Sequence, residues 1–207
     1  MHVLSATVGP LASASIDCIA ASQSGTAGTA LTLAATLTLD TPRRIIITSA
    51  GDDRTHTFTI AGTNWVGFPV TETLTGANAG ASQSVYDYAS ITSITSNHNT
   101  ASTVQVGTNG VASSIPINLD PWGFSPTSVQ VNVTGTVNVT VQQTLDDCNA
   151  TAGYTAVNWV NHPDSNLVGA TATVQGNYAY VPLNVRLLLN SGTGSATIKV
   201  IQAGPLS

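Results

Sequence analysis

The stretch VQVNVTGTVNVTV, residues 129–141, decides the fold class of this chain. In each half of the stretch valine alternates with Gln, Asn or Thr, and Thr134-Gly135-Thr136 separates the two halves. Alternation with a period of two, built from β-branched residues, is typical of a strand with one buried and one solvated face. A glycine between small polar residues is a turn signal. The stretch therefore predicts two strands joined by a turn.

The same alternation recurs along the chain, and no stretch carries the 3.6-residue period of a convincing helix. Turn signals rich in Gly, Asn and Asp separate the alternating runs, as in antiparallel sandwiches and barrels. At most a short turn is expected near residues 77–88. The sequence thus predicts an all-β protein with antiparallel strands. Further alternating runs occupy residues 31–33, 36–39, 55–60, 70–74, 103–106 and 196–201.

A seam rich in Gly, Ser and Pro interrupts this pattern at residues 107–121. Each side of the seam has the size of one sandwich domain. We therefore predict two antiparallel β-sandwich (jelly-roll-like) domains in tandem, residues 1–112 and 113–207. Within the first domain, residues 1 to about 28 are expected to form an arm that reaches a neighbouring subunit. The alternative is one larger sandwich in which the seam is a crossover.

Charge is scarce, and this excludes several classes of partner. Charged residues make up 7% of the chain, against about 25% in an ordinary globular domain. Five Lys and Arg residues cannot form the basic stripe that binds nucleic acid. No apolar stretch approaches the roughly 20 residues of a membrane-spanning helix. A surface with so few charges is weakly protected against the association of copies with one another. This property suits a protein that functions in an assembly.

The two cysteines, Cys18 and Cys148, are far apart in the chain. A disulfide between them is one alternative, but a secreted framework would show more cysteines. The N-terminal residues also lack the basic segment of a signal peptide. We expect two buried free thiols in a protein made in a reducing cytoplasm.

Six charged or histidine residues gather within residues 43–56, the segment RRIIITSAGDDRTH. Two strands flank SAGDDR, so Asp52 and Asp53 are predicted at a mobile hairpin tip and His56 on the solvent side. A catalytic histidine would need a nucleophile or a structured carboxylate beside it. The segment is interpreted as a polar turn, with a surface cation site as the alternative.

A second group of reactive residue types, Asp146-Asp147-Cys148 and His162, lacks any pair at zinc-ligand spacing. These residues are interpreted as loop-capping groups. No paired carboxylates and no G-x-S-x-G elbow accompany them. We therefore predict a protein that is not an enzyme, with no catalytic residues, no cofactor and no metal.

Aromatic residues in the second half supply the candidate interface. Tyr178 and Tyr180 are two positions apart and would share one sheet face, which with Trp159 could form a sugar-binding platform. The preferred interpretation is that one tyrosine closes the sandwich end and the other lies at a protein contact. The candidate interface residues are Trp159, His162, Tyr178 and Tyr180.

Several phrases resemble a family of all-β structural proteins of tailed-bacteriophage virions. They are TPRRIIITSAGDDRTHTFTIAGTN, TETLTGANAGASQSV, VTGTVNVTVQQTLDD, NWVNHP and GATATVQGNYAYVPLNVRLLLNSGTGSATIKVIQAG, which lie within residues 30 to 204. The resemblance carries no catalytic motif.

The resemblance implies an all-β structural component of the particle. Together with the uncharged, Thr-rich sequence, it makes a head decoration or cement protein on the capsid surface the leading hypothesis. Its expected partners are the major capsid protein or other virion proteins, and further copies of itself in a trimer or ring. It would be assembled in the host bacterial cytoplasm and reside in the virion. A head–tail connector, collar or tail component is the nearest alternative, and a receptor- or glycan-binding module is the alternative from another class.

Overall fold

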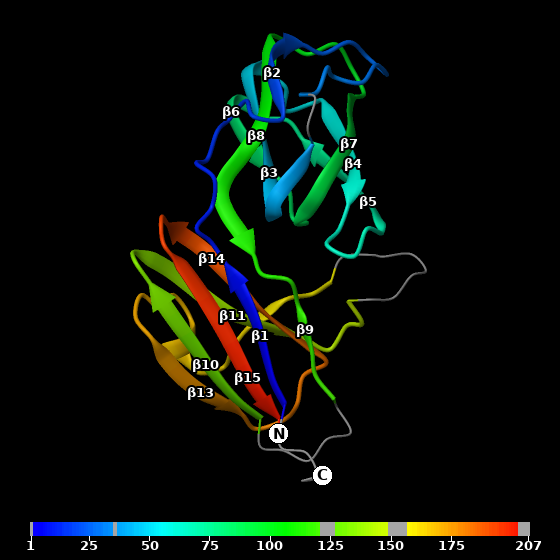
Figure 1. Cartoon of the computed structure of the whole chain (residues 1–207). Coiled ribbons are helices and arrows are strands. Elements are labelled where there is room, and N and C mark those ends of the chain that lie inside the picture. Colours follow the sequence, from blue (N-terminus) through cyan, green and yellow to red (C-terminus); the bar gives the residue numbers. More distant parts are fainter. Residues whose placement is uncertain (1, 35–36, 121–126, 149–156, 203–207) are drawn as a thin grey trace. The chain divides into compact units, whose positions relative to one another are not determined.

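The computed structural model describes residues 2–34, 37–120, 127–148 and 157–202 (Figure 1). In this part of the chain the regular structure is strand, apart from one 3-10 turn, η1 (Ser165–Leu167), and no helix is long and apolar enough to cross a bilayer. The prediction of an all-β protein is therefore confirmed. The chain divides into two compact units, unit 1 (residues 1–11 and 111–207) and unit 2 (residues 12–110).

Unit 1 contains two antiparallel sheets. The first has the strand order β1 (His2–Val8), β15 (Ser195–Gln202), β10 (Thr127–Thr134) and β13 (Val174–Tyr178). The second has the order β12 (Val160–Asn161), β11 (Val137–Thr144) and β14 (Asn184–Gly192). Strand β9 (Ile117–Asn118) and the last two residues of β8 (Thr103–Ser113) also pair with β14.

One hydrophobic core joins the two sheets of unit 1, so this unit has β-sandwich character. The two valine runs of residues 129–141 become β10 and β11, which lie in different sheets. Gly135, with a φ of 77°, makes the corner between them. Because both runs point their valines inward, they meet across the core. The buried cluster includes Val129 and Val131 of β10, Val139 and Val141 of β11, Leu187 of β14, and Ile198 and Val200 of β15.

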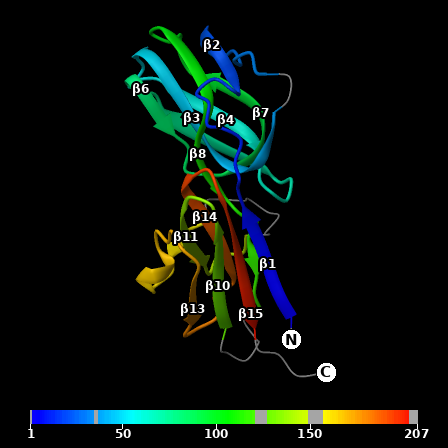
Figure 2. The same cartoon turned by 60° about the vertical axis from the view of Figure 1, so that its left-hand side comes forward.

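Unit 2 is built around the strand order β8, β3 (Thr38–Asp52), β7 (Tyr88–Ser96), β4 (Thr57–Thr63) and β5 (Pro69–Thr75). Figure 2 labels all of these strands except β5. In addition, β2 (Ala20–Ser24) pairs with β8, and β6 (Asn78–Gln83) pairs with β3. The apolar positions of the alternating runs are buried, as the pattern predicted. They include Phe58, Ile60, Val70, Val104 and Val106.

The N-terminus differs from the predicted arm. Strand β1 pairs with β15 along its whole length, from His2↔Gln202 to Val8↔Ala196, and lies beside it in Figure 1. Residues 1–11 therefore belong with residues 111–207, and not with a domain of residues 1–112. The physical reason is that β1 supplies Val8 to the core of unit 1 and satisfies one edge of β15. Residues 20–24, also assigned to the arm, pair with β8 inside unit 2.

Two local predictions are corrected in unit 2. The segment near residues 77–88 contains strand β6, which pairs with β3. The segment SAGDDR does not join a hairpin, because β7 lies between β3 and β4 in the sheet. Strand β3 continues through Asp52, which pairs with Asn78, so the predicted tip is part of a strand.

Candidate functional site

The four candidate interface residues all belong to unit 1, but the structure gives them different surroundings. Tyr178 and His162 are buried, whereas Tyr180 is exposed and Trp159 is half-buried. Tyr178 is the last residue of β13, and its side chain belongs to the core cluster. Tyr180 lies beyond the strand end, where the alternation of the strand no longer sets its direction. The two tyrosines therefore do not form a shared platform.

His162 and Tyr178 form a buried pair inside the unit. Their ring centroids are 4.4 Å apart, and the backbone N–H of Asp164 donates to His162 Nδ1 at 3.0 Å. Burial lowers the pKa of His162, although the neighbouring Asp164 acts in the opposite direction. Burial also raises the pKa of Tyr178. Both side chains are therefore neutral near pH 7, and their place in the core is structural.

Trp159 packs against a buried cation that the sequence patterns did not reveal. The guanidinium carbon of Arg186, on β14, lies 4.2 Å from the centroid of the Trp159 ring. Nε and Nη2 of Arg186 donate to Gln142 Oε1 at 3.0 and 2.9 Å. A desolvated cation over an indole ring is attracted by its quadrupole. Arg186 therefore holds Trp159 in place. The pairing of β14 with β11 sets Arg186 opposite Gln142, and the pairing of β12 with β11 brings Trp159, the residue before β12, to the same place.

Beside this cluster lies a hollow lined by exposed apolar side chains. The exposed fractions are 72% for Leu145, 59% for Val160 and 52% for Tyr180. They converge because β12 pairs with β11, which places Val160 opposite Gln143. The hollow has a volume of about 250 Å³, and we call it the apolar hollow. Its lining residues are Gln143, Thr144, Leu145, Asp146, Asn158, Val160, Tyr180 and Pro182.

Hydrogen bonds hold the apolar hollow in shape. Gln143 Nε2 donates to the hydroxyl of Tyr180 at 2.6 Å, and the backbone N–H of Asn158 donates to Asp146 Oδ2 at 2.7 Å. Groups that are already ordered lose little conformational entropy when a partner binds. Clustered apolar residues with a polar rim are typical of protein contacts. This hollow, with Tyr180 as its one predicted aromatic residue, is the best candidate functional site in the described part of the chain.

The charged segment of residues 43–56 has a structural role that differs from a mobile turn. Asp53 has an exposed fraction of 0%, and its Oδ1 accepts from the backbone N–H of Ala101 at 2.8 Å. The same oxygen lies 2.9 Å from Nδ1 of His56. The His56 ring stacks on that of His98, with centroids 5.2 Å apart. The predictions of a mobile Asp53 and a solvent-facing His56 are therefore wrong, because this turn is tied to the connection between β7 and β8.

The other charges of this segment are also paired within unit 2. Arg54 donates to both carboxylate oxygens of Asp52, at 2.9 and 2.8 Å, and this pairing lowers the pKa of Asp52 to about 2. Arg43 is buried and donates to Asp40 at 2.6 Å and to the carbonyl of Ala12 at 2.9 Å. The buried contacts of Arg43 stabilise the unit, whereas the exposed pair of Arg54 and Asp52 contributes little.

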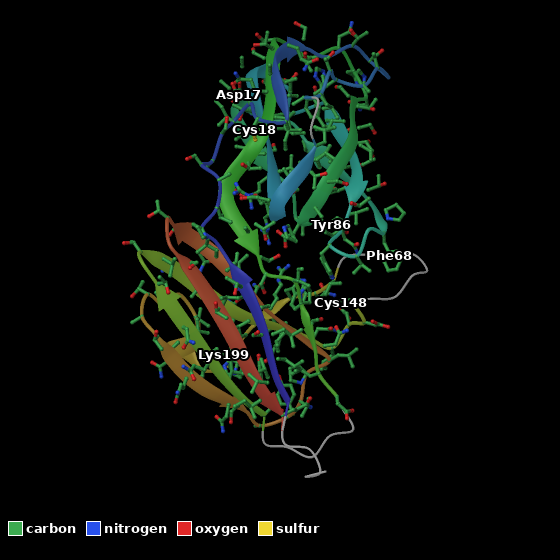
Figure 3. All side chains as sticks on the ribbon, in the orientation of Figure 1. Asp17, Cys18, Phe68, Tyr86, Cys148 and Lys199 are labelled. Atoms are coloured by element: carbon green, nitrogen blue, oxygen red, sulfur yellow. The ribbon has the colours of Figure 1, made fainter. Side chains whose placement is uncertain are left out.

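The two thiols lie in different surroundings (Figure 3). Cys148 is buried, and burial raises its pKa to about 12, against an opposing effect of Arg186. Cys18 is exposed, which corrects the expectation that both are buried. A nucleophilic cysteine needs a lowered pKa, so Cys148 is not suited to that role. Within the described ranges, no three His, Cys, Asp or Glu side chains lie close enough to hold a metal ion.

No protein-family model matches the sequence, and no curated protein matches it.

Proposed function

We propose that this chain is a non-enzymatic structural protein of a bacteriophage virion, most simply a head decoration or cement protein that binds the capsid surface. The proposal includes two jelly-roll-like sandwich domains in tandem. The two sheets that enclose one core in unit 1 support this finer description. The phrase resemblance to virion proteins supports the biological setting.

The observation that carries the proposal is that the few arginine side chains are paired inside the protein. Each of the four arginines is engaged within its own unit: Arg43 by Asp40, Arg44 by Asp87, Arg54 by Asp52, and Arg186 by Gln142 and Trp159. The exposed strand positions are mainly Thr, Ser, Asn and Gln, and exposed carboxylates such as Asp146 and Asp147 lie in the connections between strands. Neutral strand surfaces of this kind can be covered by neighbouring subunits without the cost of burying charge.

The proposed partners are the major capsid protein or other virion proteins, together with further copies of this chain in a trimer or ring. A stable contact of this kind should bury upwards of about 1,000 Å². The protein would be assembled in the host bacterial cytoplasm and remain in the virion.

The test is to add the purified protein to particles assembled without it. Decoration requires binding that saturates at a copy number set by the capsid lattice and raises the resistance of the particles to heat. A protein that does not bind to the shell contradicts the proposal. Saturation at the count of a single ring would instead identify a connector, collar or tail component. Binding to host-surface glycan, without shell binding, would identify a receptor module.

A further inference from the structure

The outer face of the four-stranded sheet in unit 1 carries two straight rows of side chains, because the strand register aligns them. Gln130 of β10 pairs with Gln175 of β13 and with Lys199 of β15, which in turn pairs with Ser5 of β1. The adjacent row consists of Asn177, Ser128, Ile201 and Val3. Paired residues share a face of a sheet. We call this surface the Lys199 face, and Figure 3 shows Lys199 on β15.

The Lys199 face has a shallow depression with one charge. The depression has a volume of about 380 Å³, and its lining includes Val3, Gln130, Gln175, Lys199 and Ile201. Lys199 is the only lysine of the chain. In the part of the chain that the structure describes, its ammonium group takes part in no ion pair or hydrogen bond, in contrast to the four arginines. One ammonium group beside apolar Val3 and Ile201 is therefore available to a partner.

The apolar hollow has the complementary character. Its lining includes the exposed Asp146, and the next residue of the chain, Asp147, is exposed as well. The hollow lies at the edge of the other sheet of unit 1, and the two surfaces have no lining residue in common. One copy can therefore offer both surfaces at the same time.

We propose that the Lys199 face of one copy binds the apolar hollow of a second copy. Lys199 pairs with Asp146 or Asp147, while Val3 and Ile201 cover Leu145, Val160 and Tyr180. This inference rests on the proposed function, because it names the surface by which the virion protein would form its ring.

Charge decides against the two symmetric alternatives. A contact between two Lys199 faces would bring like ammonium groups together, and a contact between two hollows would do the same with two pairs of aspartates. The mixed contact pairs opposite charges and covers apolar surface on both sides. A contact between two different surfaces is heterologous, and it gives a ring where the rotation between neighbouring copies closes, as the proposed function requires.

The test reverses charges and measures association by sedimentation over a range of concentrations. Lys199→Glu should raise the dissociation constant at least about tenfold, since like charges now meet. Asp147→Lys should do the same, and the double variant should regain association. Arg54→Glu is the matched control, because it reverses an exposed charge in unit 2 and should leave association unchanged. A monomeric wild-type protein, or a Lys199→Glu variant that associates as wild type does, overturns the inference.

A second pair of variants tests the apolar part of the contact. Leu145→Ser removes a side chain that is 72% exposed, and Val85→Ser removes one that is 66% exposed in unit 2. Both should leave the melting temperature almost unchanged, and only Leu145→Ser should weaken association. Equal association of the two variants contradicts the assigned surface.

Shell binding separates this inference from the proposed function. Wild-type protein that binds shells without self-association through these surfaces refutes only the inference. A protein that forms a ring through Lys199 and Asp147 but does not bind to shells refutes only the decoration role.

Discussion

Asp52 and Asp53 are adjacent carboxylates with opposite surroundings, and their replacement by alanine tests the description of this turn. Asp52 is exposed and pairs with Arg54, and exposed ion pairs contribute little to stability. Asp53 is fully buried and accepts from the backbone N–H of Ala101, while its side chain also contacts the imidazole of His56. Asp52→Ala should therefore be nearly neutral, and Asp53→Ala should be destabilising.

The magnitude for Asp53→Ala follows from the groups that it leaves behind. A buried donor that loses its partner costs about 1–3 kcal/mol. Two such groups, the N–H of Ala101 and Nδ1 of His56, would give about 2–6 kcal/mol at full burial. Because Ala101 is exposed and His56 is half-buried, water replaces part of the lost bonding. Removal of the second carboxylate oxygen, Oδ2, which is buried without a partner, offsets part of this cost. We therefore expect a loss of about 2–4 kcal/mol in the free energy of unfolding.

The assay is urea denaturation of the full-length chain, with hydrogen exchange to report on unit 2 separately. Asp53→Asn is the control for side-chain size, because its amide oxygen can still accept from Ala101. It should lose less stability than Asp53→Ala. Equal and small effects of Asp52→Ala and Asp53→Ala would refute the reasoning, since they would mean that Asp53 is solvated as the sequence pattern suggested.

Three other predictions use single groups in the two units. Phe58→Ala should lower the free energy of unfolding by about 3–5 kcal/mol, because Phe58 is fully buried in unit 2; a loss below that of Asp53→Ala would contradict its place in the core. Alkylation without denaturant should label Cys18 quickly and Cys148 only on unfolding, since burial raises the pKa of Cys148 to about 12; intact mass reports this, and early labelling of Cys148 would show that it is accessible. Burial lowers the pKa of His162 in the folded protein below its usual 6.5, against the smaller effect of Asp164. The unfolded chain therefore binds more protons at this group, so its contribution to the free energy of unfolding is complete above about pH 6.5 and decreases as the pH falls through the unfolded and then the folded pKa. Melting curves from pH 7.5 to 5 should show a fall in melting temperature that His162→Gln reduces, and identical slopes for both proteins would refute this prediction.

Local patterns predicted the strands well and their partners poorly. The alternating valines of residues 129–141 identify β10 and β11, and the turn at Gly135 follows from its neighbours. Nothing in that stretch indicates that the two strands enter different sheets. The segment SAGDDR looks like a hairpin connection for the same reason, although β7 lies between the strands that it connects.

The candidate site shows the same division. Tyr180 and Trp159 could be proposed as contact residues from their type, whereas the burial of Tyr178 and His162 depends on where β13 ends and how β12 packs. Arg186 lies on a strand far from Trp159 in sequence, and no spacing rule connects a guanidinium to an indole 27 positions earlier. Leu145 and Val160 form one surface only because two residues of β12 pair with β11.

The sequence by itself determined that this protein is all-β, that its apolar strand positions are buried and that its charges are few. These properties depend on neighbours in the chain, because the side-chain period of a strand is local. Only the tertiary structure decided that the first strand completes unit 1 beside β15, that Asp53 is buried, and that Lys199 is available on an outer sheet face while Arg186 is engaged. Those outcomes depend on pairing between strands distant in sequence, where many registers satisfy the same alternation and the shared core selects one.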